Sequence, residues 1–380
     1  MATVVGSTLG ASLAVASVVA LKVARIVLTP PTTRDDHVRV LAVDRTQGTV
    51  TFAAHPDVSI PGKYTYFFDD DTAHARVGDI VSLAEGQVTR RLIAEDEGQI
   101  VSGVRGRISA WYFLSPAELD ILYEEVVIDT DLGPAPAWLV PASTATESWV
   151  IQVHGRGVDR REPVRAIPVF REAGFTSLIV SYRNDGVAPS SADGRYALGD
   201  TEWRDIDDAL RFAVDHGARS IILMGWSMGG AIVLQTATRS RFAPLITGLV
   251  LESPVIDWMR VLNYQARALH IPAPIRRLVF RLISSGWSRR LTGQDAPINL
   301  QGLDFVRRAA DIRMPTLILH SDSDSYVPSD ASRELAALRP DTVTLERFSG
   351  AGHTRLWNYD APRWEAAIRR WLESGLQRFF

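Results

Sequence analysis

Apolar and polar positions divide the chain into three stretches with different spacing. Residues 3–21 are apolar or small and carry no charged side chain. From residue 37 to about residue 115, short alternating runs are separated by turn residues, which predicts β-strands. From about residue 122, short apolar runs alternate with segments of helical spacing. That alternation predicts a mostly parallel sheet with helices on both faces.

The second stretch is interpreted as a small β module. Residues 37–43 and 49–52 alternate around Thr46-Gln47-Gly48, which is a hairpin signal. Further strands are expected at 64–68, 80–83 and 88–93. The acidic run Asp69-Asp70-Asp71 lacks the ligand spacing of a calcium-binding loop, so we interpret it as a solvated turn. The module contains no catalytic motif.

The third stretch has a regular order that is interrupted once. Strands are expected at 126–128, 137–140, 149–153, 177–182, 220–224, 246–252, 316–320 and 343–348. Helices are expected around residues 164–170 and at 201–216, 231–237 and 361–376. Residues 254 to about 310 break the alternation with helical pieces, prolines and arginines. We expect this excursion to form a cap over the carboxyl edge of the sheet.

The apolar N-terminus has three interpretations: a membrane-spanning helix, a cleaved signal peptide, or a helix docked on the protein. An uncharged run of this length can just cross a bilayer. No Lys or Arg precedes it, which disfavours a signal peptide. We therefore prefer a single N-terminal span and membrane association. Lys22 and Arg25 follow the run, and this position of positive charge favours a cytoplasmic catalytic domain.

Gly225-Trp226-Ser227-Met228-Gly229-Gly230 fits the pattern G-x-S-x-G, the nucleophile elbow. A strand-like run precedes it and a helix-like run follows it, which is the context that gives the motif meaning. Glycines on both sides allow a turn so tight that side chains would clash there. Ser227 would then project from the top of the sheet at a helix N-terminus, where developing negative charge is favoured.

Composition excludes several classes of function. The chain has no cysteine, so disulfides, thiolate metal sites and cysteine catalysis are excluded. The net charge is −3, and nothing indicates a nucleic-acid partner.

The order of Ser227, an acid after a later strand, and His353 near the end resembles the α/β-hydrolase superfamily. The resemblance covers about residues 120–380 and is greatest for the branch of serine-aminopeptidase-like proteins and acyl-ester hydrolases. It implies an α/β-hydrolase fold with a mostly parallel sheet and a helical cap. The expected domains are an apolar N-terminal segment at 1–28, the β module at 37–115, and the hydrolase domain at 116–380 with its cap at about 254–310.

His353 lies in a glycine-rich loop just past the last strand, where the resemblance places the catalytic base. A serine hydroxyl barely ionises at neutral pH, so an imidazole must take its proton. Asp324 precedes Val327-Pro328 in the manner of the family's acid. Asp322 and Glu252 are the alternative acids.

The oxyanion hole is expected to use the backbone N–H of Met228 and, by resemblance, that of Arg156 in the sequence His154-Gly155-Arg156-Gly157. The Arg156 side chain either faces the substrate or is solvated. We interpret His154 as a residue that orders this loop and His320 as structural.

These features predict a serine hydrolase that cleaves a carboxylic ester or related acyl bond. A serine peptidase and an inactive hydrolase-like scaffold are the alternatives. The expected partner is a small acyl ester or peptide, and neither a metal nor an organic cofactor is implied.

The cap adds an expectation about lipid. Residues 254–310 contain nine arginines and three aspartates. Together with the apolar N-terminus, this basic cap suggests contact with an anionic membrane surface. The alternative is a cap helix whose apolar side covers the active site and whose arginines are solvated.

Overall fold

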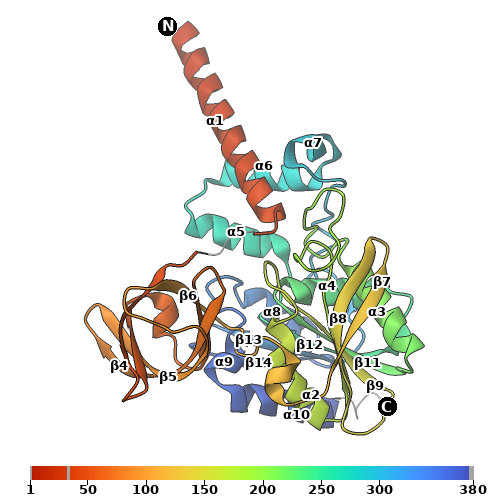
Figure 1. The fold of residues 1–380 in the computed structure, drawn as a ribbon. Coiled ribbons are helices and arrows are strands. Elements are labelled where there is room, and N and C mark those ends of the chain that lie inside the picture. Colours follow the sequence, from red (N-terminus) through yellow and green to blue (C-terminus); the bar gives the residue numbers. More distant parts are fainter. Residues whose placement is uncertain (1, 32–34, 376–380) are drawn as a thin grey trace.

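An eight-stranded sheet runs through the larger part of the molecule (Figure 1). The computed structural model describes residues 2–31 and 35–375, with side chains described for residues 15–31 and 35–373. The strands are β7 (Glu124–Thr130), β8 (Gly133–Val140), β9 (Ser148–Val153), β10 (Thr176–Val180), β11 (Ser220–Trp226), β12 (Ile246–Glu252), β13 (Thr316–Ser321) and β14 (Val343–Phe348). Their spatial order is β14-β13-β12-β11-β9-β10-β8-β7. Only β7 and β8 run antiparallel to their neighbours, so the predicted mostly parallel sheet is confirmed.

Helices cover both faces of this sheet. They are α2 (Ile167–Glu172), α3 (Trp203–Asp215), α4 (Met228–Arg239), α8 (Asp330–Leu338), α9 (Leu356–Tyr359) and α10 (Ala361–Gly375). Successive residues of the central strands enter different cores: Leu223 packs with α3 and α4, whereas Ile222 and Met224 pack with α2 and α10. Because both faces of such a strand are buried, its sequence is a continuous apolar run.

The cap consists of α5 (Trp258–Ala268), α6 (Ala273–Ser284) and α7 (Arg289–Thr292). Helix α6 turns Val279, Leu282 and Ile283 inward, while Arg277 and Arg281 are exposed. The apolar side of α6 therefore faces the protein, where it packs against α1, and does not line the cleft at Ser227.

The N-terminal helix α1 (Ala2–Leu28) packs on the cap rather than standing free along its whole length (Figure 1). Ala20, Ala24 and Leu28 recur every four residues and are fully buried in the main core. Arg25 Nε donates to the Leu291 carbonyl of the cap at 2.9 Å. The part of α1 with described side chains is therefore a docked helix.

The prediction of a single N-terminal membrane span is wrong on this finding. Among the residues with described side chains, no helix is both long enough and apolar enough to cross a membrane. Residues 3–14 of the predicted span lie outside those residues. The apolar positions of the last turns contact protein, and uncharged composition alone cannot distinguish that partner from lipid. The inference of a cytoplasmic catalytic domain depended on the span and is withdrawn with it.

Residues 38–109 form a closed six-stranded antiparallel barrel with the order β1-β2-β5-β4-β3-β6. The strands are β1 (Val38–Asp44), β2 (Thr49–Ala53), β3 (Tyr64–Phe68), β4 (Ala73–Ala84), β5 (Gln87–Glu97) and β6 (Arg105–Ser109). Strand β6, which pairs with β1 and closes the barrel, was not predicted. Arg90 is completely buried and donates to the carbonyls of Gly78, Val58, Ile60 and Gly62, so its charge is held by backbone oxygens.

The barrel is fixed to the hydrolase part through α9. Lys63 N–H donates to the Asn358 carbonyl at 3.0 Å, and the Asn358 amide donates to the carbonyls of Lys63 and Ala110 at 2.8 and 3.0 Å. The Lys63 ammonium lies 4.0 Å from the centre of the Trp357 ring. At Gly62, an added Cβ would lie 2.2 Å from the Asn358 carbonyl oxygen, so the two backbones touch directly.

Candidate active site

Ser227 occupies a sharp turn between β11 and α4, at φ 51° and ψ −115°. This backbone conformation is strained for a residue with a side chain. The positions two residues before and two residues after Ser227 must be glycine. An added Cβ on Gly225 would lie 2.4 Å from the Gly229 carbonyl oxygen, and one on Gly229 would lie 2.2 Å from the Val153 carbonyl oxygen. The predicted strand–turn–helix context of the elbow is confirmed.

Three side chains from separate loops form a hydrogen-bonded chain at this turn. His353 Nε2 lies 2.9 Å from Ser227 Oγ, and His353 Nδ1 lies 2.7 Å from Asp324 Oδ2. Asp324 follows β13 and His353 follows β14. Because these strands are parallel to β11, their carboxyl ends bring all three residues to one edge of the sheet.

Asp324 is buried and its two oxygens have separate partners. Oδ1 accepts the backbone N–H groups of Tyr326 and Val327 at 2.9 and 2.8 Å. Oδ2 faces His353 and also lies 3.4 Å from His320 Nε2. Burial alone would raise the pKa of Asp324, but the two histidines outweigh it and hold the pKa well below its usual range. The carboxylate is therefore ionised at neutral pH.

The alternative acids lie in other surroundings. Asp322 pairs on the surface with Arg347 at 2.6 Å and Arg333 at 3.0 Å. Glu252 is fully buried and accepts from the indole N–H groups of Trp226 and Trp364 at 2.8 and 2.9 Å. Burial raises the pKa of Glu252. In the described hydrogen bonds neither carboxylate contacts His353.

The loop after β9 passes beside the nucleophile. An added Cβ on Gly155 would lie 3.3 Å from Ser227 Cβ. The Gly155 N–H donates to the Glu162 carboxylate at 2.7 Å, and His154 Nε2 lies 3.2 Å from Asp185 Oδ2. Burial alone would lower the pKa of His154, but its contact with Asp185 raises it. These contacts fix the backbone on either side of the loop, in agreement with the ordering role expected for His154.

The Arg156 side chain follows neither of the courses considered from the sequence. Its Nη2 donates to the carbonyls of Ile26 and Thr29, each at 2.8 Å. Its guanidinium lies 5.6 Å from the centre of the Tyr196 ring. Arg156 therefore holds the C-terminal end of α1, while its backbone stays beside the elbow. Met228 begins α4, so its N–H is among those that lack a partner within the helix.

A cleft of about 460 Å³ opens above Ser227 and His353. One wall belongs to the barrel and its exit segment and consists of Pro56, Asp57, Ile60, Arg107, Ile108, Ser109, Ala110 and Trp111. No local sequence signal marks these residues, because the β module has no motif and reaches the site only through tertiary packing.

A second cavity of about 210 Å³ lies between α1 and the cap helices α5 and α6. Its lining is largely apolar and includes Val23, Val27, Val261, Ala266, Val279 and Phe280. Arg156 and Tyr326 line both this cavity and the catalytic cleft. The Tyr326 ring centre lies 5.1 Å from that of His353, so the apolar cavity lies close to the base.

Comparison with known proteins gives two family matches. Residues 150–368 match the profile described as the Alpha/beta hydrolase family. Residues 39–109, which span the barrel, match a domain of unknown function (DUF8805).

Individual relatives are distant. A Pseudomonas putida 2-hydroxy-6-oxononadienedioate/2-hydroxy-6-oxononatrienedioate hydrolase is 32% identical over 40% of this chain, and the chain spans only 55% of that protein's length. An uncharacterized Mycobacterium tuberculosis protein is 26% identical over 65% of this chain and 78% of its own. The Pyrococcus furiosus esterase Pf2001 superposes with a TM-score of 0.52 at 16% identity, over 68% of this chain and 93% of that one.

At this low identity the structural likeness shows a shared fold. The predicted fold class, with a helical cap, an N-terminal helix and a β module, is confirmed. Since the family profile covers more than half of the chain, this protein belongs to the alpha/beta hydrolase family.

Proposed function

We propose that this hydrolase is a serine esterase that works through an acyl-enzyme, with Ser227 as nucleophile, His353 as base and Asp324 as the acid. The observation that carries the proposal is the Asp324–His353–Ser227 hydrogen-bonded chain at the floor of an open cleft. A serine peptidase would use the same groups, and the bond that is cleaved distinguishes the two enzymes.

In the proposed reaction, His353 Nε2 takes the Ser227 proton as Oγ attacks the carbonyl carbon of the ester. Asp324 keeps the His353 proton on Nδ1 and stabilises the imidazolium. The tetrahedral oxyanion is bound by the N–H groups of Met228 and Arg156. His353 then protonates the leaving alcohol, and a water molecule activated by the same imidazole hydrolyses the acyl-enzyme.

The apolar cavity beside Tyr326 supports an ester with an aliphatic acyl chain. Each methylene buried there contributes about 0.8 kcal/mol, or roughly a fourfold gain in kcat/KM until the space is filled. Ala266→Trp would fill the cavity from α5. Ala268 lies on the same helix, is exposed and does not line the cavity, so Ala268→Trp is the matched control.

Two measurements test the proposal. A fluorophosphonate probe should label the wild type and not Ser227→Ala, whereas an inactive scaffold would resist labelling in both forms. Hydrolysis of p-nitrophenyl esters of increasing chain length, compared with aminoacyl anilides, separates esterase from peptidase. The Ala266→Trp variant should lose activity on the long esters before it loses activity on the short ones. If its chain-length preference is unchanged, the cavity does not bind the acyl chain.

A further inference from the structure

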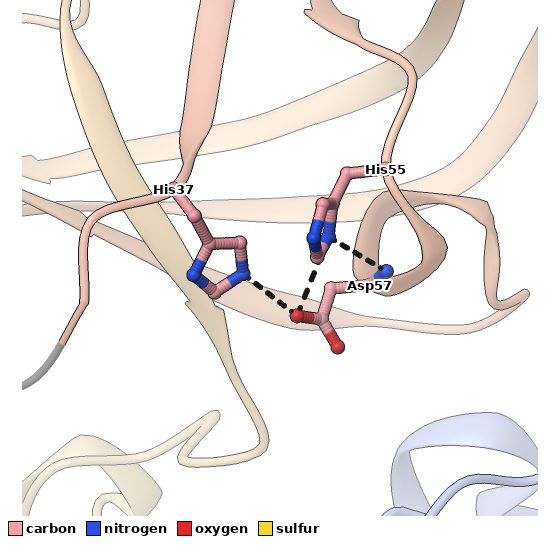
Figure 2. Close-up of side chains that lie close together, drawn as sticks. All are labelled: His37, His55 and Asp57. Carbon is pink, nitrogen blue, oxygen red and sulfur yellow. Dashed lines mark hydrogen bonds and ion pairs between the residues drawn. The ribbon is translucent and has the colours of Figure 1, made fainter. Parts of the chain in front are cut away.

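Three potential ligand atoms converge at the edge of the barrel, outside the catalytic chain of residues. His37 Nε2 lies 2.9 Å from Asp57 Oδ2, and His55 Nδ1 lies 3.5 Å from the same oxygen. All three ligand atoms lie within 4.8 Å of one another (Figure 2). His37 begins the barrel, whereas His55 and Asp57 come from the segment between β2 and β3.

The hydrogen bonds around the cluster allow all three atoms to act as acceptors. His37 Nδ1 lies 2.8 Å from the Asp35 carbonyl oxygen, which can only accept, so the Nδ1 proton is used there and the neutral ring presents a lone pair at Nε2. His55 Nδ1 accepts the Asp57 backbone N–H at 3.2 Å and is therefore unprotonated. Asp57 Oδ2 is a carboxylate oxygen. Three lone pairs facing one point repel one another unless a cation lies between them.

The surroundings also resemble the supports that metal ligands receive. A ligating histidine usually donates its other ring N–H to a carbonyl or carboxylate, as His37 does to Asp35. Asp57 is held through its other oxygen, because Oδ1 accepts from Arg355 Nη1 at 2.8 Å. The side chains of His37, His55 and Asp57 are 33, 35 and 26% exposed, so an ion can enter from solvent.

We propose that His37 Nε2, His55 Nδ1 and Asp57 Oδ2 bind a divalent transition-metal ion, with Zn²⁺ best suited to two imidazoles and one carboxylate. Zinc–ligand bonds of about 2.0–2.2 Å allow ligand atoms up to about 4 Å apart, which accommodates the separations of 2.9 and 3.5 Å from Asp57 Oδ2 to the two imidazole nitrogens. The ion replaces the long hydrogen bond from the Asp57 N–H to His55. It leaves the Asp57–Arg355 pair in place.

The position of the site relates it to the cleft. Asp57 and Arg355 both line the cleft, and Arg355 follows His353 by two residues. A bound ion would therefore hold Asp57 in the position from which it pairs with Arg355, and this pair joins the barrel wall to the loop that carries the base. Among the described residues, a second group of potential ligands consists of Asp131, Asp205 and Asp208. It is a weaker candidate for a metal site, because Arg183 already pairs with Asp131 and Asp205.

The test uses the full chain without an affinity tag, stripped with a chelator and titrated with Zn²⁺ by calorimetry. Co²⁺ is added in parallel, because its absorption spectrum reports tetrahedral nitrogen and oxygen ligands. We expect one ion per chain. His37→Gln and His55→Gln should each weaken binding by about a hundredfold or more. His74→Gln is the matched control: His74 lies on β4 of the same barrel, outside the cluster, and should bind like the wild type.

Circular dichroism of each variant shows that it is folded, and thermal melting gives a second readout. Zn²⁺ at about 100 times the wild-type Kd should raise the folded-to-unfolded ratio of the wild type about a hundredfold and that of His37→Gln by no more than about twofold. The proposal is overturned if the wild type binds no ion, or if the His37 and His55 variants bind as tightly as the control. In that case the contact between His37 Nε2 and Asp57 Oδ2 is a hydrogen bond and not half of a metal site.

Discussion

Asp324→Asn removes one charge from the site and changes its hydrogen bonding in a way that the structure specifies. Oδ1 must accept two backbone N–H groups, from Tyr326 and Val327. Oδ2 must accept from His353, and it also lies beside His320. His320 Nε2 donates to the Val327 carbonyl at 3.0 Å, so it too presents a proton. An asparagine has a single oxygen and cannot serve both sides.

The backbone donors decide which way the amide turns. Its oxygen replaces Oδ1, so its NH₂ group faces the two histidines. His353 must then accept at Nδ1 and carry its proton on Nε2, which points at Ser227 Oγ. An imidazole in that tautomer cannot take the serine proton. The same substitution of a triad aspartate in a serine protease lowers kcat about 10⁴-fold, equivalent to about 5 kcal/mol, and we expect a loss of that order here.

Asp322→Asn is the matched control, two residues away and of the same chemistry. It removes ion pairs with Arg347 and Arg333 that lie on the surface, which costs at most about 1 kcal/mol of stability and nothing in turnover. The assay is the rate of fluorophosphonate labelling, which does not require knowledge of the natural substrate, together with kcat on a p-nitrophenyl ester.

The reasoning fails if the two variants are equally active, or if Asp322→Asn is the slower one. The first result would mean that His353 needs no carboxylate to hold its tautomer. The second would transfer the role of the acid to Asp322. Melting curves of both variants exclude unfolding as the cause.

Three further predictions concern stability. Arg156→Ala should cost about 1.5–3 kcal/mol in free energy of unfolding, because its charged hydrogen bonds to the end of α1 are lost. The rate of Ser227 labelling should stay within a few-fold of the wild type, because the backbone N–H remains. A labelling rate lowered a hundredfold would give the side chain a role in the chemistry. Gly86 and Gly62 both have positive φ, but only Gly62 lies against another backbone segment, at Asn358. In urea unfolding, Gly86→Ala should cost about 1–2 kcal/mol of stability and Gly62→Ala distinctly more. Equal costs would argue against the tight docking at Asn358. The folded-state pKa of Asp324 is depressed, so the stability that this carboxylate contributes is complete above about pH 4 and is lost as the pH falls. Between about pH 5 and about pH 3, Asp324→Asn should therefore lose less stability than the wild type. Parallel curves of unfolding free energy against pH would contradict this.

The sequence was sufficient for the parts of the site that have local signals. The elbow has a fixed spacing and a strand and helix on either side. The candidates Asp324 and His353 each follow a strand of the parallel sheet, and parallel strands bring their carboxyl ends to one edge. The barrel wall had no such signal, because its contact with α9 joins residues almost 300 positions apart. The docking of α1 was considered but not preferred, because alanine and leucine at four-residue spacing suit a protein core as well as a bilayer.

The contact between the barrel and α9 also bears on how the chain is made. The barrel is complete at Ser109, but the loop that receives it, at Thr354 to Tyr359, emerges from the ribosome about 245 residues later. At about 5–20 residues per second, that interval is roughly 12–50 s. During this time Lys63 and Gly62 lack their contacts with Trp357 and Asn358, so the docking surface of a nascent barrel is exposed to other molecules in the cell. The barrel wall of the cleft is synthesised early and His353 late, so the cleft is complete only when synthesis is nearly finished.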